Sequence, residues 1–180
     1  MDHCDECGFN YADYSTKVVA TELFQLGVRY SSRLRIPVND SKAREFLSRR
    51  PDQDTWSAIE YGCHLRDVLI AQRERLFLTL ATDRPSFASI FLDQRAVLAR
   101  YSAQTPEQVA RDIECAAGMI SWAFSGLDDS AWWRPCIYNY PEPAERNVIW
   151  LAQHTLHEGE HHLLDFDRVI ALNSLAQGDT

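Results

Sequence analysis

Histidines gather near the end of this chain in a pattern that favours metal binding. Four of the six lie within nine residues, at positions 154, 157, 161 and 162. The spacing of four between His157 and His161 would place both on one helix face, about one turn apart. Two imidazoles arranged in this way can share a divalent ion. We therefore predict that His157 and His161 are metal ligands.

The same segment matches a protease motif, which we consider and set aside. His157-Glu158-Gly159-Glu160-His161 has the form HExxH, the signature of many zinc proteases. Those enzymes need a third protein ligand, usually a Glu or His further along the chain. No Glu or His follows His162. We therefore expect the third ligand to come from an earlier segment.

His64 is the best candidate for that third ligand. It lies in an apolar stripe shared with Tyr61 and Val68, on the side of its expected helix that faces the interior. Taken alone, His64 could be a buried histidine bonded to a backbone carbonyl, and His157 and His161 could form a solvated polar face. Three imidazoles would leave a coordination position open, as in catalytic rather than structural metal sites. No catalytic residue beyond the metal ligands can be named.

Other polar and aromatic residues could orient the ligands or line a pocket beside them. Hydrogen-bonding partners behind the ligands commonly fix their orientation in metal sites. For each carboxylate taken singly, an ordinary place on the surface is the alternative. The candidates are Glu60, Tyr61, Asp67, Trp150, His154 and Asp165.

Cys4 and Cys7 form a CxxC pair near the N-terminus. This is half of a zinc-ribbon pattern, and the second CxxC is missing. An auxiliary metal site would need further ligands, for which the candidates are His3, Cys63, Cys115 and Cys136. Redox activity and an inert arm are the alternatives.

Hydrophobic periodicity predicts an all-α fold. Helices are expected over residues 15–34, 41–50, 54–80, 87–101, 105–124 and 145–175, and no strand pattern competes with them. A loop rich in Trp, Tyr and Pro separates the last two, and we expect either a pocket wall or a packed crossover there. The prediction is an irregular arm over residues 1–14, followed by one domain over residues 15–180. That domain is expected to be an up-and-down four-helix bundle with a long crossover.

Composition narrows the classes of partner. The formal net charge is −8, and no basic stripe with interleaved aromatics is present, which argues against nucleic acid as a partner. No apolar run is long enough to span a membrane, and no basic and apolar leader pattern opens the chain. We expect a cytoplasmic protein that acts on a small molecule, and a homodimer is compatible with the sequence.

Three segments together resemble the DinB/YfiT-like superfamily. Glu60-Tyr61-Gly62-Cys63-His64-Leu65-Arg66-Asp67-Val68 is similar to its second-helix motif. His157-x-x-x-His161-His162-Leu163-x-Asp165 is similar to its last-helix motif, and Cys4-x-x-Cys7-Gly8-Phe9 resembles the opening of an actinobacterial subset. The resemblance implies a four-helix bundle that binds zinc or nickel through three histidines, which here would be His64, His157 and His161.

The resemblance also implies a class of reaction. Such proteins transfer or isomerise small molecules with a low-molecular-weight thiol such as mycothiol or bacillithiol. Arginine outnumbers lysine sixteen to two, which suggests a GC-rich genome and favours mycothiol. A metal-dependent thiol S-transferase is therefore our leading hypothesis. The alternatives are a metal-dependent hydrolase or biosynthetic tailoring enzyme, and a non-catalytic module that binds a small molecule or metal.

Overall fold

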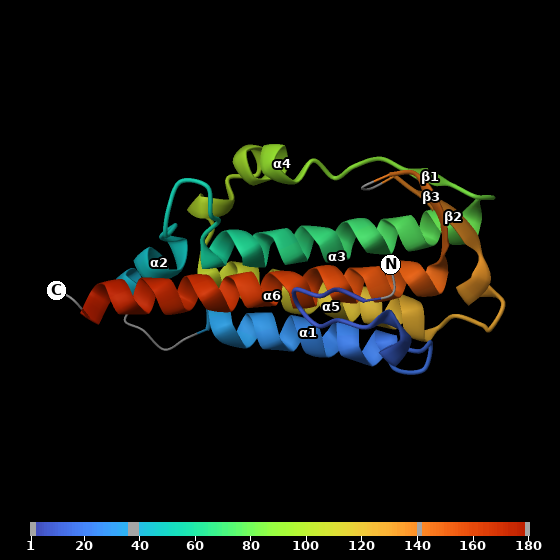
Figure 1. Ribbon diagram of the computed structural model, residues 1–180, viewed down its shortest axis with the longest axis horizontal. Coiled ribbons are helices and arrows are strands. Elements are labelled where there is room, and N and C mark those ends of the chain that lie inside the picture. The colour runs from blue at the N-terminus through green and yellow to red at the C-terminus, as the bar shows by residue number, and fades with distance from the viewer. Residues whose placement is uncertain (1–2, 36–39, 140–141, 179–180) are drawn as a thin grey trace.

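The chain folds around four long helices that pack side by side. The computed structural model describes residues 3–35, 40–139 and 142–178. The four helices are α1 (Val19–Leu34), α3 (Ala58–Ala81), α5 (Pro106–Ser125) and α6 (Val148–Gly178). Two shorter helices, α2 (Asp40–Ser48) and α4 (Leu92–Leu98), lie outside this bundle (Figure 1). The predicted four-helix bundle is confirmed, and no described helix is long and apolar enough to cross a membrane.

The directions of the four long helices do not simply alternate along the chain. Helix α1 packs against α5 and α6, and α3 packs against the same two helices. The colour gradient shows that α1 and α6 run in one direction and α3 and α5 in the other (Figure 1). Because α3 and α5 are parallel, the chain must return along the outside of the bundle between them. That return, rather than the Trp-rich loop, is the long crossover, and it contains α4 where a longer helix over 87–101 was expected.

A small sheet covers one end of the bundle and was not predicted. Strand β2 (Pro135–Tyr138) lies between β1 (Ser86–Phe87), which is parallel to it, and β3 (Ala144–Asn147), which is antiparallel. Strands of two to four residues are too short to give a periodic hydrophobic signal. Pairing of Glu145 with Ile137 also explains why α6 begins at Val148 and not at the expected Glu145. Tyr140 and Pro141 of the expected loop lie outside the described residues.

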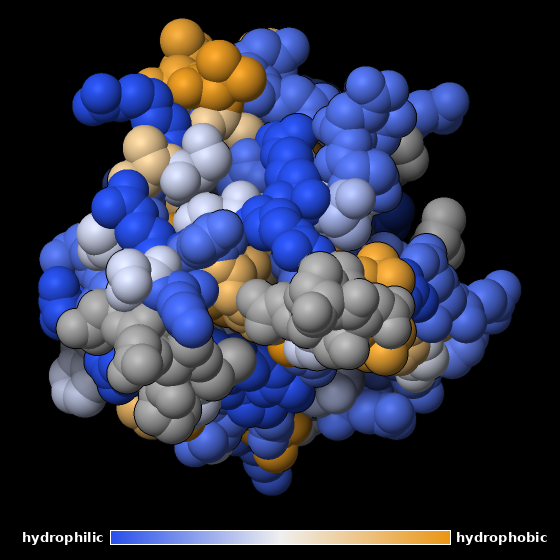
Figure 2. Space-filling view, turned by 90° about the vertical axis from the view of Figure 1, so that its left-hand side faces the viewer, coloured by the Kyte–Doolittle hydropathy of each residue, from blue (hydrophilic) through white to orange (hydrophobic). Residues whose placement is uncertain are grey.

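Three turns of 3-10 helix complete the elements: η1 (Tyr11–Asp13), η2 (Tyr101–Ala103) and η3 (Ala131–Trp133). The first belongs to the N-terminal arm, which lies along α6 and buries Phe9 in the common core. Seen end-on, the bundle surface is largely hydrophilic, with an apolar group at the top of the view and smaller ones at the right and at the bottom (Figure 2). The group at the top lies over α4, where Val97 and Leu98 are largely exposed.

Helices α1 and α5 are in close contact at Gly27. A Cβ atom built at Gly27 would lie 2.3 Å from the Cβ of Ala117, which is part of the rigid helix surface. The absence of a side chain at position 27 therefore sets the distance between these two helices.

We expect Gly27→Ala to lower the free energy of unfolding by about 1–3 kcal/mol, because overpacking outweighs the gain in helix propensity. Urea denaturation followed by circular dichroism measures this change. The matched control is Gly118→Ala on α5, where nothing lies within 4 Å of the added Cβ, and we expect it to raise stability by up to about 1 kcal/mol. Adding Ala117→Gly to Gly27→Ala should restore stability, and equal effects of the two single glycine substitutions would contradict this account.

Candidate metal centre

Helix α6 divides the histidine cluster between two sides of the helix. Successive residues on a helix are about 100° apart, so His157 and His161 share one face while Glu158 and His162 share the next. The first pair lies with Cys4 and Cys7 of the arm, and the second lies with His64 of α3. The structure therefore does not bring the expected triad of His64, His157 and His161 into one group. His64 does face α6, but its partners there are Glu158 and His162.

The group formed by His64, Glu158 and His162 is called the α3/α6 centre below. One ligand atom from each residue lies within 4.8 Å of those of the other two. The rings of His64 and His162 meet edge to face, with 4.8 Å between centroids. His64 is buried, and its Nε2 atom has no hydrogen-bond partner among the described residues. A buried nitrogen of this kind needs a partner, and a metal ion would provide one.

Burial favours the neutral forms of both His64 and Glu158, and the neutral form of His64 suits metal binding. Burial lowers the pKa of His64 to about 3, so its imidazole is neutral at physiological pH and can donate a lone pair. Burial raises the pKa of the Glu158 carboxyl, while the nearby His162 and His161 act in the opposite direction. Two imidazoles and one carboxylate are a known ligand set for a divalent ion, with further positions left open.

Close packing at Gly159 brings the two halves of the centre together. A Cβ at this position would lie 2.2 Å from Leu26 Cδ2 and 3.1 Å from Leu65 Cδ1, so a side chain here would force the Leu26 side chain or α6 to move. The hydroxyl of Tyr30 donates a hydrogen bond of 2.9 Å to the Gly159 carbonyl oxygen. Gly159 follows Glu158 directly, so these contacts hold the ligand-bearing part of α6 against α1 and α3.

Asp165 supports the centre from behind. Its carboxylate lies 3.1 Å from His162 Nδ1, one turn along α6. That hydrogen bond lowers the pKa of Asp165 and leaves the other nitrogen of His162 for the centre. The sequence had suggested that Asp165 orients a metal ligand, and in the structure the histidine that it contacts is His162. Tyr61 lies beside the same histidine, with 5.6 Å between ring centroids.

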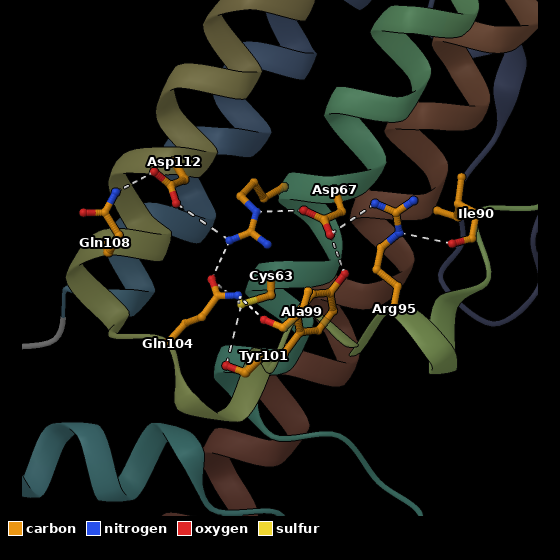
Figure 3. Close-up of polar contacts among 10 residues, drawn as sticks. Cys63, Asp67, Ile90, Arg95, Ala99, Tyr101, Gln104, Gln108 and Asp112 are labelled. Atoms are coloured by element: carbon orange, nitrogen blue, oxygen red, sulfur yellow. Dashed lines mark hydrogen bonds and ion pairs between the residues drawn. The ribbon is translucent and has the colours of Figure 1, made fainter. Parts of the chain in front are cut away.

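Glu60 and Asp67, the other two candidate carboxylates, have different partners. Glu60 accepts hydrogen bonds from the backbone and hydroxyl of Ser57, which closes a capping box at the start of α3, and it pairs with Arg50. Asp67 accepts a hydrogen bond of 2.7 Å from the Tyr101 hydroxyl and lies 3.7 Å from Arg95 (Figure 3). These two carboxylates tie neighbouring segments to α3, and neither forms a hydrogen bond to a histidine.

The second group, called the arm cluster below, consists of Cys4, Cys7, His157 and His161. All four side chains are half-buried, and their ligand atoms lie within 4.8 Å of one another. A hydrogen bond from the backbone of Cys7 is the main cause that lowers the pKa of the Cys4 thiol, to about 7. Burial raises the pKa of the Cys7 thiol. The sequence had left open which residues would complete a site with Cys4 and Cys7, and had not considered the late histidines for it.

A pocket opens beside the α3/α6 centre and shares Val68 and Glu158 with its surroundings. Its walls come from α3, from the crossover, from β2 and from α6, and its polar side chains include Arg75 and His154. Burial lowers the pKa of His154 to about 3. Trp150 stacks on the His154 ring at 4.4 Å between centroids. Of the two expected pocket residues, His154 therefore lines the pocket itself, and Trp150 packs against His154.

Three residues of these sites were missed from the sequence: Tyr11, Glu158 and His162. Glu158 and His162 have the same i, i+4 spacing as His157 and His161, one position later, so spacing gave no reason to choose between the pairs. Asp165 three residues after His162 was the available signal for the second pair. Nothing in the sequence indicated that the Tyr11 hydroxyl would lie 3.1 Å from His154 Nδ1 and 3.2 Å from His157 Nδ1.

Comparisons with known proteins agree with this architecture. The family model for the DinB superfamily matches residues 40–165, more than half of the chain. The fold is similar to the solved structure of YfiT from Bacillus subtilis, described as a probable metal-dependent hydrolase with an unusual four-helix bundle topology. The TM-score is 0.69 at 15% sequence identity, over 85% of this chain and 86% of that one. None of the curated proteins compared with the chain matched it.

We expect Asp165→Asn to weaken zinc binding at the α3/α6 centre by about 10–100-fold, because His162 loses the carboxylate that orients it. Competition with a chromophoric chelator measures the affinity, in a Cys4→Ser, Cys7→Ser background so that only this centre is titrated. The control is Asp167→Asn, two residues further along α6, whose carboxylate pairs with Arg33. Equal zinc affinities for the two aspartate variants would show that Asp165 does not support the α3/α6 centre.

Proposed function

Because the chain belongs to the DinB superfamily, we propose that it is a metal-dependent enzyme centred on His64, Glu158 and His162. The observation that carries this proposal is the buried His64 Nε2, which has no partner among the described residues and faces two further ligand side chains beside a pocket. When bound, a divalent ion would supply a Lewis acid with an open position, where a nucleophile loses its proton more readily. A set of nitrogen and oxygen ligands suits zinc or nickel.

The residues around the centre would hold the ligands and exclude water. Asp165 orients His162, and the packing at Gly159 keeps Glu158 against α3. The apolar side chains of Val68, Phe87 and Ile90 form part of the pocket wall. A substrate in the pocket would therefore contact apolar side chains while it approaches the α3/α6 centre. Glu158 would lie between the pocket and the other two ligands of the centre.

Arg75 supports a substrate with an anionic group. Its guanidinium donates to neutral acceptors, which include the Tyr138 hydroxyl at 3.0 Å and the Gln72 amide oxygen at 3.2 Å. Arg75 forms no ion pair with a carboxylate among the described residues, although Glu158 lines the same pocket. A guanidinium in a pocket without an anionic partner is suited to bind a carboxylate or phosphate of a ligand.

For the reaction, we propose thiol-dependent transfer to a small electrophile. The sulfur of a mycothiol-type thiol would form a bond to an electrophilic carbon of the acceptor. The thiol proton would leave with the displaced group, or would add to the neighbouring carbon when the acceptor is a double bond. Support comes from the similarity of the second and last helices to a family in which such reactions occur, and from an open metal position beside an apolar pocket.

Hydrolysis is the second candidate, favoured by a specific observation. Two histidines and one glutamate are the ligands of several zinc hydrolases. The similar YfiT structure is itself described as that of a probable metal-dependent hydrolase. In this case water would replace the thiol as the nucleophile.

Turnover with and without a thiol separates the two reactions. We expect the zinc- or nickel-loaded protein to consume mycothiol in the presence of electrophilic acceptors, measured as loss of free thiol and as adduct mass. His64→Ala should reduce this rate to background, because it removes a metal ligand, whereas His3→Ala should leave it unchanged because His3 lies outside the centre. Turnover of esters or amides without a thiol would select hydrolysis, and neither activity in the loaded protein would overturn the proposal of an enzyme.

Anion binding tests the role of Arg75. We expect succinate or inorganic phosphate to raise the melting temperature of the metal-loaded protein, and Arg75→Met to abolish that shift. Arg73→Met is the matched control, because Arg73 lies on the same helix outside the pocket and pairs with Glu74. An equal shift in both variants would show that the anions bind elsewhere.

A further inference from the structure

The arm cluster joins two segments that are at least 150 residues apart in the sequence. Cys4 and Cys7 lie in the N-terminal arm, and His157 and His161 lie on α6. From these side chains we propose a second metal site, a closed Cys2His2 zinc site that fastens the arm to the bundle. It shares no ligand with the α3/α6 centre, although the two sites are adjacent, since ligand atoms of His157 and Glu158 lie within 4.8 Å of each other. Its two cysteines also precede residue 40, where the match to the family model begins.

The number and spacing of the ligands fit structural zinc. Two cysteines with two residues between them and two histidines with three between them follow the pattern of structural Cys2His2 sites. Four protein ligands leave no position open, in contrast to the three of the α3/α6 centre. Two thiolates would also neutralise the charge of the ion, so a half-buried site would carry no net charge.

The distances agree with tetrahedral coordination. With Zn–S of about 2.3 Å and Zn–N of about 2.0–2.1 Å, a tetrahedral ion separates a sulfur from a nitrogen ligand by about 3.5–3.6 Å. The Sγ atom of Cys4 lies 3.7 Å from Nδ1 of His161. The arrangement therefore needs little movement to accept an ion.

The backbone of the arm holds the two thiols in place. The amide of Cys4 donates to the Phe9 carbonyl oxygen, and the amide of Gly8 donates to the Cys4 carbonyl oxygen, both at 2.8 Å. Gly8 has a φ of +72°, a left-handed conformation that glycine adopts without strain. His3 and Asn10 form a β-bridge beyond this turn. The result is a short hairpin with both cysteines at its tip, anchored by the buried Phe9.

Each histidine of the cluster has one nitrogen available and a partner at the other. His157 Nε2 is buried with no partner among the described residues, while its Nδ1 lies 3.2 Å from the Tyr11 hydroxyl. His161 presents Nδ1 to Cys4, and its Nε2 lies 3.6 Å from the Glu6 carboxylate. Metal-bound histidines typically have such a partner at the second nitrogen, which fixes the ring orientation.

Occupation of this site would also order one wall of the pocket. The Tyr11 hydroxyl lies between His157 of the arm cluster and His154 of the pocket. Ion binding at ligands on both the arm and α6 would favour the docked arm over a released one. Zinc bound at the arm cluster would therefore hold Tyr11, and through it His154, in position beside the substrate.

Metal content of the purified full-length chain tests the proposal. We expect about two zinc ions per chain in the native protein, one in Cys4→Ser, Cys7→Ser, and one in His64→Ala, His162→Ala. Cys115→Ser is the control and should retain two, because Cys115 is exposed and outside both sites. An unchanged zinc content in the Cys4→Ser, Cys7→Ser protein would overturn the arm site, whereas an unchanged content in His64→Ala, His162→Ala would overturn the α3/α6 centre instead.

Cobalt substitution gives a second test that does not depend on how the cysteine variant folds. Cobalt(II) in the His64→Ala, His162→Ala protein should show thiolate-to-metal charge transfer and intense tetrahedral d–d bands. Absence of these bands, or mass-spectrometric detection of a Cys4–Cys7 disulfide in the metal-loaded protein, would overturn the proposal.

Limited proteolysis should cleave the arm faster after chelation of the zinc. An unchanged rate of cleavage would contradict the proposal that zinc fastens the arm to the bundle.

Discussion

The distance of α6 from α1 and α3 governs both candidate metal sites. At Gly159 the helix approaches Leu26 and Leu65 so closely that a Cβ would force the Leu26 side chain or the helix to move, and the Tyr30 hydroxyl donates a hydrogen bond to the carbonyl oxygen at the same point. The residues on either side of this contact carry the ligands. A helix held further away would separate Glu158 and His162 from His64, and it would also change the surface on which the arm lies.

One helix can serve two sites because neighbouring residues point in different directions. His157 and His161 face the arm, whereas Glu158 and His162, one step later, face α3. The two ligand sets also differ in chemistry. Two thiols and two imidazoles form a closed set that suits a structural ion, and two imidazoles with one carboxylate leave positions open. In the proposed assignment, one ion would hold the arm against α6 while the other would be available to a substrate.

The crossover and the arm connect these sites to the pocket. Because α3 and α5 are parallel, the chain between them must run back outside the bundle, and it supplies Phe87 and Ile90 to the pocket wall. The arm reaches the pocket from the other side through Tyr11 and His154. The sequence predicted a helix over 87–101 and an irregular arm over 1–14, and the structure places both segments next to the pocket or its lining residues.

The sequence by itself determined the helices of the bundle and the concentration of histidines on the last helix, and it singled out His64 as an inward-facing residue. These follow from local periodicity and from residue chemistry, which depend on neighbours along the chain. It could not determine which ligands share an ion, because the pairs 157/161 and 158/162 have identical spacing and differ only in the direction they face. That direction is set by long-range packing at Gly159, and the partners of Cys4 and Cys7 are set by the docking of the arm. The short strands and the route of the crossover were likewise decided by contacts between distant segments, which leave no periodic signal in the sequence.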